Sequence, residues 1–122
     1  MPANKSLLII DDSRVSRMMI KQLVSSKQPD WNILEAADGE TGLKLAAEND
    51  INFFSIDLNM PGIDGLEVIE QLQKTHGSCS MVLMTANIQQ AIFKRAMALG
   101  ASCIHKPITE ESIGHMLEIF NG

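Results

Sequence analysis

The chain of 122 residues contains no tyrosine, one tryptophan and four phenylalanines. It also lacks any run of basic residues, because Lys and Arg number 10 against 15 for Asp and Glu, which gives a net charge of −5. Proteins that track nucleic-acid phosphates need a basic surface. The composition therefore argues against direct binding of DNA or RNA.

Long apolar runs are missing as well. No segment approaches the ~20 apolar residues of a membrane-spanning helix, and the first six residues pass directly into a short apolar run, unlike a signal peptide. The two cysteines, Cys79 and Cys103, lack the C-x-x-C spacing of redox and zinc sites. We expect both to be reduced and buried. These absences predict a cytoplasmic protein without a membrane anchor.

The length suits one compact domain, which we place at residues 1–122. A chain of this size buries roughly two thirds of its unfolded surface, so it needs neither disulfides nor a structural metal to fold. The hydrophobic content of 45% agrees with this expectation. The sequence shows no internal repeat, linker or low-complexity segment.

Short apolar runs alternate with amphipathic segments along the whole chain. Runs that are apolar at every position are typical of strands covered on both faces, as in a parallel sheet. The predicted strands are 7–10, 33–34, 52–56, 81–84 and 102–104. Five strands that alternate with five helices favour right-handed parallel crossovers. The predicted fold is α/β, with a doubly wound, five-stranded parallel sheet.

Helix starts and buried faces can be predicted from capping residues and apolar spacing. The predicted N-caps are Ser13, Asp38, Asp64 and Thr109, and Gly100 is predicted to end the fourth helix. For the first two helices, the residues expected to face inward are Val15, Met18, Met19 and Leu23, then Leu43, Ala46 and Ala47. For the others they are Leu66, Ile69 and Leu72, then Ile88, Ile92, Ala96 and Leu99, then Ile113, Met116, Leu117 and Phe120.

Charged or hydroxyl-bearing residues follow four of the predicted strands. Asp11 and Asp12 follow the first strand, Asp57 the third, Thr85 the fourth and Lys106 the fifth. The carboxyl ends of parallel strands meet at one edge of the sheet, where ligands bind in open α/β folds. We therefore expect these side chains to share one crevice.

Three carboxylates in one crevice raise one another's pKa values unless a cation neutralises them. Mg²⁺ prefers oxygen ligands and commonly uses one or two carboxylates together with phosphate oxygens. Lys106 supplies a second positive charge suited to a phosphoryl oxygen, and Thr85 supplies a hydroxyl donor. A carboxylate nucleophile among such groups makes a phosphoryl-transfer site. The residues thus predict an aspartyl phosphate on Asp57.

Four segments in this order and spacing carry a resemblance to a known family. They are Leu-Leu-Ile-Ile-Asp-Asp-Ser at 7–13, Asp-Leu-Asn-Met-Pro-Gly-Ile-Asp-Gly at 57–65, Met-Thr-Ala at 84–86 and His-Lys-Pro at 105–107. Together they resemble the receiver domain of bacterial response regulators, and the similarity covers the whole chain. The resemblance implies a flavodoxin-like sheet of strand order 2-1-3-4-5. It also implies phosphorylation by a histidine kinase or a phosphotransfer protein.

The resemblance assigns a role to each acidic residue of the crevice. Asp57 would be the phosphoacceptor and a metal ligand. Asp12 would bind the metal directly, Asp11 through water, and Asn59 through its backbone carbonyl. The implied ion is Mg²⁺, with Mn²⁺ as a substitute. The chain's own chemistry would be limited to accepting and slowly hydrolysing the phosphoryl group, so we do not expect an enzyme with a separate substrate.

The resemblance also implies how the signal leaves the site. Thr85 would hydrogen-bond the phosphoryl group, Lys106 would pair with it, and the Lys106–Pro107 bond would be cis. Phosphorylation would draw Thr85 inward and remodel the face formed by the fourth helix, fifth strand and fifth helix, which selects the downstream protein. The family usually has Tyr or Phe three residues before the lysine, whereas this chain has Cys103. We therefore expect activation to be weaker or to use another surface.

The chain ends after the last predicted helix, so we expect it to signal by protein contact or phosphate relay. A monomer is expected, with dimerisation on phosphorylation as the alternative. Two other functions stay open at this point. The missing aromatic suggests a receiver-like interaction module that works without phosphorylation. A small magnesium-dependent phosphohydrolase is the second, although Asn59 stands where such enzymes usually carry another acid.

Overall fold

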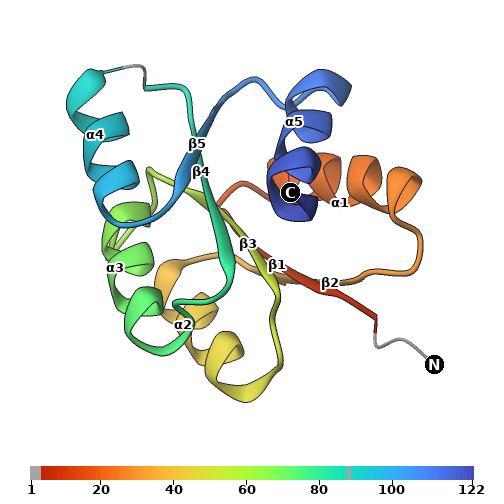
Figure 1. The fold of residues 1–122 in the computed structure, drawn as a ribbon, viewed down its shortest axis with the longest axis horizontal. Coiled ribbons are helices and arrows are strands. Elements are labelled where there is room, and N and C mark those ends of the chain that lie inside the picture. The colour runs from red at the N-terminus through yellow and green to blue at the C-terminus, as the bar shows by residue number, and fades with distance from the viewer. Residues whose placement is uncertain (1–3, 88) are drawn as a thin grey trace.

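The computed structural model describes residues 4–87 and 89–122. Its strands are β1 (Ser6–Ile10), β2 (Asn32–Ala36), β3 (Phe53–Asp57), β4 (Ser80–Thr85) and β5 (Ser102–His105). Its helices are α1 (Arg14–Lys27), α2 (Gly39–Glu48), α3 (Gly65–Thr75), α4 (Gln90–Ala98) and α5 (Glu110–Asn121). The strands are all parallel and lie in the order β2-β1-β3-β4-β5 (Figure 1). The predicted fold class and strand order are confirmed.

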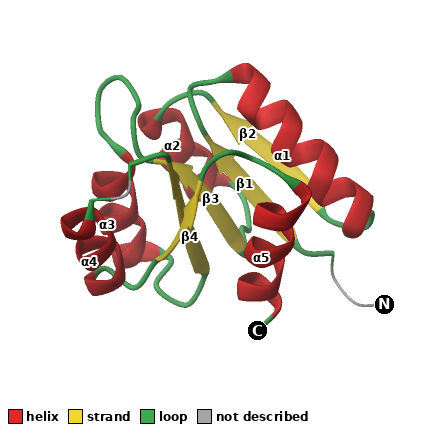
Figure 2. Cartoon of the chain, turned by 90° about the horizontal axis from the view of Figure 1, so that it is seen from above, coloured by secondary structure: helices red, strands yellow, loops and turns green. Residues whose placement is uncertain are grey.

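Helices cover both faces of the sheet. Figure 2 shows α1 and α5 on one side of the strands and α2, α3 and α4 on the other. In β1, Leu8 and Ile10 join the core under α2 and α3, whereas Leu7 and Ile9 join the core under α1 and α5. All four side chains are fully buried, which explains why this strand has no polar alternation.

The predicted buried face of α1 is wrong. Three of the four side chains predicted to face inward are exposed by 65%, 58% and 41%, namely Val15, Met18 and Met19. Ile20 and Val24 face the core instead, and Leu23 is half-buried against it. The apolar spacing was misleading because one inward position is filled by a polar side chain, Arg17, which finds polar partners under the helix.

The predicted face of α2 is correct only in part. Of the three residues expected to be inward, Ala46 is buried, Leu43 is half-buried and Ala47 is exposed. The helix lies against the sheet through Gly42, where an added Cβ would collide with the Ile10 side chain. Close approach through glycine replaces apolar side-chain packing, so the apolar pattern alone could not find this face.

The helix caps and the buried faces of α3 and α5 follow the prediction, whereas on α4 Ala96 is buried and Ile92 and Leu99 are half-buried against the core. Ser13, Asp38, Asp64 and Thr109 each accept a hydrogen bond from a main-chain N–H in the first turn of the helix that follows. Gly100, with φ +85°, follows α4 in the left-handed conformation that glycine adopts without strain. Of the residues predicted to face inward from the fourth helix, Ile88 lies outside the described residues.

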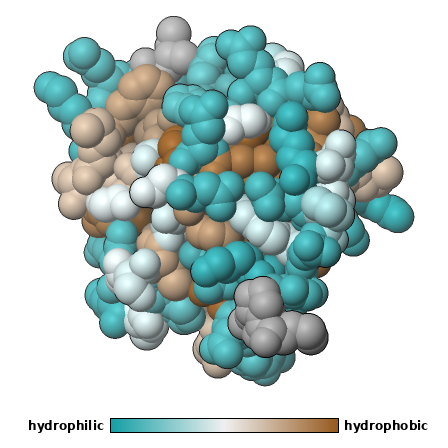
Figure 3. Space-filling model, turned by 45° about the vertical axis from the view of Figure 1, so that its right-hand side comes forward, coloured by the Kyte–Doolittle hydropathy of each residue, from teal (hydrophilic) through white to brown (hydrophobic). Residues whose placement is uncertain are grey.

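Two further expectations concern the surface. Cys79 and Cys103 are free thiols, as predicted, but the predicted burial is wrong, because both are half-buried. Cys103 lies on β5, at the edge of the sheet. In the described part of the chain, no helix combines the length and hydrophobicity needed to cross a bilayer. Hydrophilic side chains cover most of the face in Figure 3, with hydrophobic ones visible between them. The cytoplasmic location stays a prediction.

Candidate functional site

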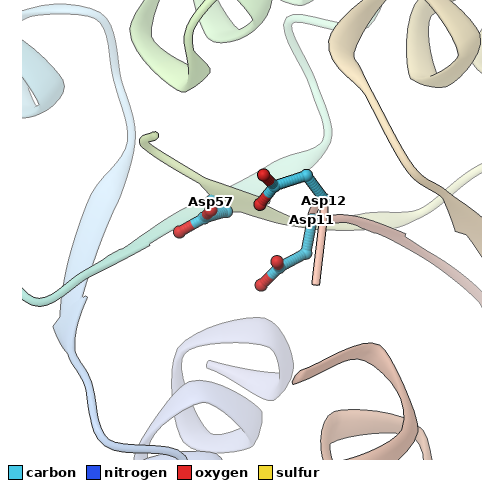
Figure 4. Close-up of side chains that lie close together, drawn as sticks. All are labelled: Asp11, Asp12 and Asp57. Atoms are coloured by element: carbon cyan, nitrogen blue, oxygen red, sulfur yellow. The ribbon is translucent and has the colours of Figure 1, made fainter. Parts of the chain in front are cut away.

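Three carboxylates from distant parts of the chain meet at the carboxyl edge of the sheet. Asp11 and Asp12 directly follow β1, and Asp57 is the last residue of the neighbouring strand β3. One carboxylate oxygen from each residue lies within 4.8 Å of the others (Figure 4). The structure thus brings together the three acidic residues that the sequence predicted.

Burial makes this cluster electrostatically unfavourable on its own. The side chains of Asp11 and Asp57 are only 2% and 9% exposed, while Asp12 is open to solvent. Burial, followed by repulsion from Asp11, raises the pKa of Asp57 above its ordinary value. Lys106 opposes this rise without cancelling it. A further positive charge would therefore stabilise the ionised carboxylates of the cluster.

Lys106 supplies one positive charge between two of the carboxylates. Its Nζ lies 3.1 Å from Asp57 Oδ1 and 3.2 Å from Asp11 Oδ2. Burial by itself would lower the pKa of Lys106, but bonds and charges from Asp57 and Asp11 outweigh burial and raise it. The ammonium group is thus charged at neutral pH. The peptide bond between Lys106 and Pro107 is cis, as the family resemblance implied.

Thr85 ends β4 beside the cluster and is buried, with 1% of its surface exposed. Its Oγ1 accepts a hydrogen bond from the main-chain N–H of Asn87, at 2.9 Å. Oδ1 of Asn87 accepts in turn from the N–H of Gln89, also at 2.9 Å, directly before α4. Because Oγ1 is the acceptor in this bond, the hydroxyl proton of Thr85 is still available for donation. Two hydrogen bonds therefore link Thr85 to the start of α4.

The loop after β3 contains Asn59, whose side chain is exposed. No described contact of Asn59 joins it to the carboxylate cluster, so its role as a carbonyl ligand stays a prediction. Gly65 is a residue whose importance the sequence did not reveal. A Cβ at Gly65 would collide with the main-chain oxygen of Asp57, so only glycine lets α3 begin against the end of β3.

Arg17 and Glu35 were also missed. Arg17 Nη1 donates to the main-chain oxygen of Asp11 at 2.7 Å, and its Nε donates to Glu35 Oε1 at 3.1 Å. Glu35 lies on β2 and Asp11 directly follows β1, so Arg17 joins α1 to β2 and to the end of β1. No local pattern marks such a pair, because the contact depends on the packing of α1 across the two strands.

The donor set fits a hard divalent cation. The cluster contains three carboxylates and one ammonium group, which leaves it with excess negative charge, and all three carboxylates offer oxygen ligands. Mg²⁺ binds such oxygen sites while keeping several waters. Asp11, Asp12 and Asp57 are the side chains that would hold it.

Comparison with protein families matches residues 7–118 to the response regulator receiver domain. The chain belongs to this family. The receiver is 32% identical over 114 residues to the chemotaxis protein CheY of Listeria monocytogenes, a match that covers 92% of this chain and 94% of that protein. It is 35% identical over 97 residues to the nitrate/nitrite response regulator NarL of Escherichia coli K12, covering 79% of this chain and 44% of NarL.

Among solved structures, the receiver is similar to a CheY-like receiver domain protein from Methanospirillum hungatei. The TM-score is 0.87 at 20% identity, and the match covers 95% of this chain and 92% of that one. At this identity the likeness concerns the fold. The receiver therefore spans nearly all of CheY but less than half of NarL, so the activity of the larger regulator does not transfer to it directly.

Proposed function

We propose that this receiver accepts a phosphoryl group on Asp57 from a histidine kinase or a phosphotransfer protein, with Mg²⁺ as cofactor. The observation that carries the proposal is the grouping of Asp57 with Lys106, Asp11 and Asp12 at one edge of the sheet. A nucleophile, a cation and a divalent-ion site are the parts that phosphoryl transfer requires.

The proposed reaction is a single displacement at phosphorus. A carboxylate oxygen of Asp57 forms a bond to the phosphorus of the donor phosphohistidine while the nitrogen–phosphorus bond breaks. The departing imidazole nitrogen keeps the electron pair and takes up a proton. Lys106 lies beside the attacking carboxylate and would pair with a phosphoryl oxygen, and the Thr85 hydroxyl would donate to another.

Mg²⁺ would neutralise charge shared between the carboxylates and the phosphoryl oxygens when bound. Asp12 and Asp57 would be its direct ligands, Asp11 would act through water, and Asn59 would contribute its main-chain carbonyl. Burial of Asp11 and Asp57 limits competing water, so their charges are available to the ion. Mn²⁺ has the same preference for oxygen ligands and would substitute.

The signal would leave through the face made by α4, β5 and α5, which would bind a downstream protein. The hydrogen bonds from Thr85 through Asn87 to Gln89 support this route, because they end at the start of α4. On the same face, Cys103 lines a cleft of about 410 Å³ with Phe93 and Met97. The smaller side chain leaves open space where the family usually places an aromatic ring.

The test is incubation with acetyl phosphate and Mg²⁺, followed by intact-mass measurement and an assay for released phosphate. We expect one phosphoryl group per chain in the wild type and none in Asp57→Asn. Asp64→Asn is the matched control, because asparagine caps a helix as well as aspartate and Asp64 lies outside the cluster. Fast phosphate release without an accumulated phosphorylated chain would indicate a phosphohydrolase instead, and neither uptake nor release would indicate a module that works without phosphorylation.

A further inference from the structure

Arg17 occupies a position on α1 that an amphipathic helix normally gives to an apolar residue. It lies one turn before Ile20 on the buried side, and its side chain is only 15% exposed. Burying a guanidinium group costs free energy unless its donors are paired. The partners of Arg17 are the main-chain oxygen of Asp11 and the carboxylate of Glu35.

Every polar group of Asp11 has a hydrogen-bonding partner. Its main-chain N–H donates to the oxygen of Ala36, its Oδ1 accepts from the N–H of Ser13, and its Oδ2 faces Lys106. These contacts fix the side chain and the N-terminal side of the residue. Arg17 fixes the remaining group, the carbonyl that leads to Asp12.

That carbonyl constrains where Asp12 points. The peptide unit between Asp11 and Asp12 is planar, so holding its oxygen also sets the orientation of the Asp12 N–H and Cα. Asp12 is exposed, and packing does little to orient its side chain. Its carboxylate nevertheless lies within 4.8 Å of those of Asp11 and Asp57.

Glu35 keeps the charge of Arg17 away from the cluster. The pair is 3.1 Å apart, and Lys21 also approaches Glu35, at 3.7 Å. Because Arg17 is neutralised by Glu35 and contacts only the main chain of Asp11, it leaves the carboxylate oxygens free for a cation. A lysine cannot replace it, because a single ammonium group does not reproduce the fixed fork that serves both partners.

We infer that Arg17 is a positioning residue for the cation site: it holds the Asp11–Asp12 peptide so that both carboxylates face Asp57. The inference rests on the proposed magnesium-dependent function. It adds a residue outside the ligand set whose loss weakens cation binding without removing a ligand. Residues that orient metal ligands commonly contribute about 10- to 100-fold to metal affinity.

The experiment measures Mn²⁺ affinity by EPR in the wild type, Arg17→Lys and Arg17→Met, each checked for folding by circular dichroism. We expect affinity to fall about 10-fold or more in both variants. Lys21→Met is the matched control, because Lys21 also pairs with Glu35 but does not contact Asp11. It should bind Mn²⁺ within about twofold of the wild type, since exposed ion pairs contribute little.

A second readout separates positioning from a general loss of stability. In Arg17→Lys, the cation concentration that gives half the maximal rate of labelling by acetyl phosphate should rise, while the rate at saturating cation stays near the wild-type value. Variants that are less stable yet bind Mn²⁺ like the wild type would overturn the inference alone. A wild-type protein that bound no cation would overturn both the inference and the proposed function.

Discussion

The Lys106 ammonium group lies 3.1 Å from Oδ1 of Asp57, although β4 lies between β3, which Asp57 ends, and β5, which Lys106 follows. The lysine side chain therefore reaches across the end of β4 to meet the carboxylate. This contact exists before any phosphoryl group arrives. A phosphorylated Asp57 would place new negative charge beside an ammonium group that is already in position, which reduces the reorganisation that transfer requires.

Asp57 should lower the stability of the metal-free protein. Its pKa is raised above the ordinary value of 3.8, first by burial and then by Asp11. The folded protein thus holds this proton more tightly than the unfolded chain, so the ionised carboxylate is destabilising at neutral pH. The penalty disappears as the pH falls through the raised pKa toward 3.8. Asp57→Asn should therefore raise the free energy of unfolding at pH ~7, because it removes the buried negative charge.

Urea unfolding in EDTA measures this effect. Trp31, whose ring stacks on Phe53 at 4.7 Å, provides a natural fluorescence signal. Asp64→Asn should leave the stability unchanged. Added Mg²⁺ should stabilise the wild type more than Asp57→Asn, because a ligand stabilises the state that binds it. A metal-free Asp57→Asn protein less stable than the wild type would contradict the account of the cluster.

A second prediction concerns which face of α1 is buried. Ile20 is 1% exposed and Met18 is 58% exposed on the same helix. Ile20→Ala should lower the free energy of unfolding by about 2 to 4 kcal/mol, because it leaves a cavity in the core. Met18→Ala should change it by less than about 0.5 kcal/mol. Equal losses in the two variants would mean that the helix is rotated from the orientation described.

The sequence was sufficient to predict the edge of the sheet but not every helix face. Asp57 ends β3, Asp11 directly follows β1 and Lys106 directly follows β5, and parallel strands must place their carboxyl ends together. The face of α1 could not be predicted, because the buried position of Arg17 depends on Asp11, which follows β1, and on Glu35 in β2. Such tertiary polar contacts leave no periodic signal in the chain.

Two helix–sheet contacts could not be predicted because they are made at glycine residues. Gly42 and Gly65 carry no side chain that an apolar pattern registers, yet each marks a place where a helix touches the sheet. Cys103 was expected to be buried as a small hydrophobic residue, but it lies on β5, the edge strand of the described sheet, and is only half-buried. Burial at the edge of a sheet depends on what packs there, which the residue type does not determine.

Thr85 should couple the site to α4. Thr85→Ala removes the acceptor of the Asn87 N–H. We expect this variant to bind beryllium fluoride with Mg²⁺ while the amide NMR signals of residues 89–97 shift much less than in the wild type. Thr75→Ala, which removes an exposed hydroxyl on α3, is the control. Wild-type shifts in Thr85→Ala would show that the signal reaches α4 by another route.

The two thiols should react slowly at neutral pH. Burial raises the pKa of both Cys79 and Cys103 above the ordinary value of 9.0, and the Cys79 thiol also donates to the oxygen of Ile51 at 3.1 Å. Alkylation by iodoacetamide at pH ~7 should be at least ~10-fold slower than in the urea-unfolded chain and should accelerate as the pH passes ~9. Mass mapping of each cysteine follows the rates. A thiol that reacts in the folded protein as fast as in urea would contradict the burial described.

The most direct test of the central claim locates the phosphoryl group. Protein incubated with acetyl phosphate and Mg²⁺ is treated with borohydride, which reduces an aspartyl phosphate to homoserine, and the peptides are sequenced by mass spectrometry. We predict homoserine at position 57 and unmodified aspartate at positions 11, 12 and 64. Homoserine at another position, or a protein that yields none although donor and Mg²⁺ are saturating, would contradict the assignment of Asp57 as the phosphoacceptor.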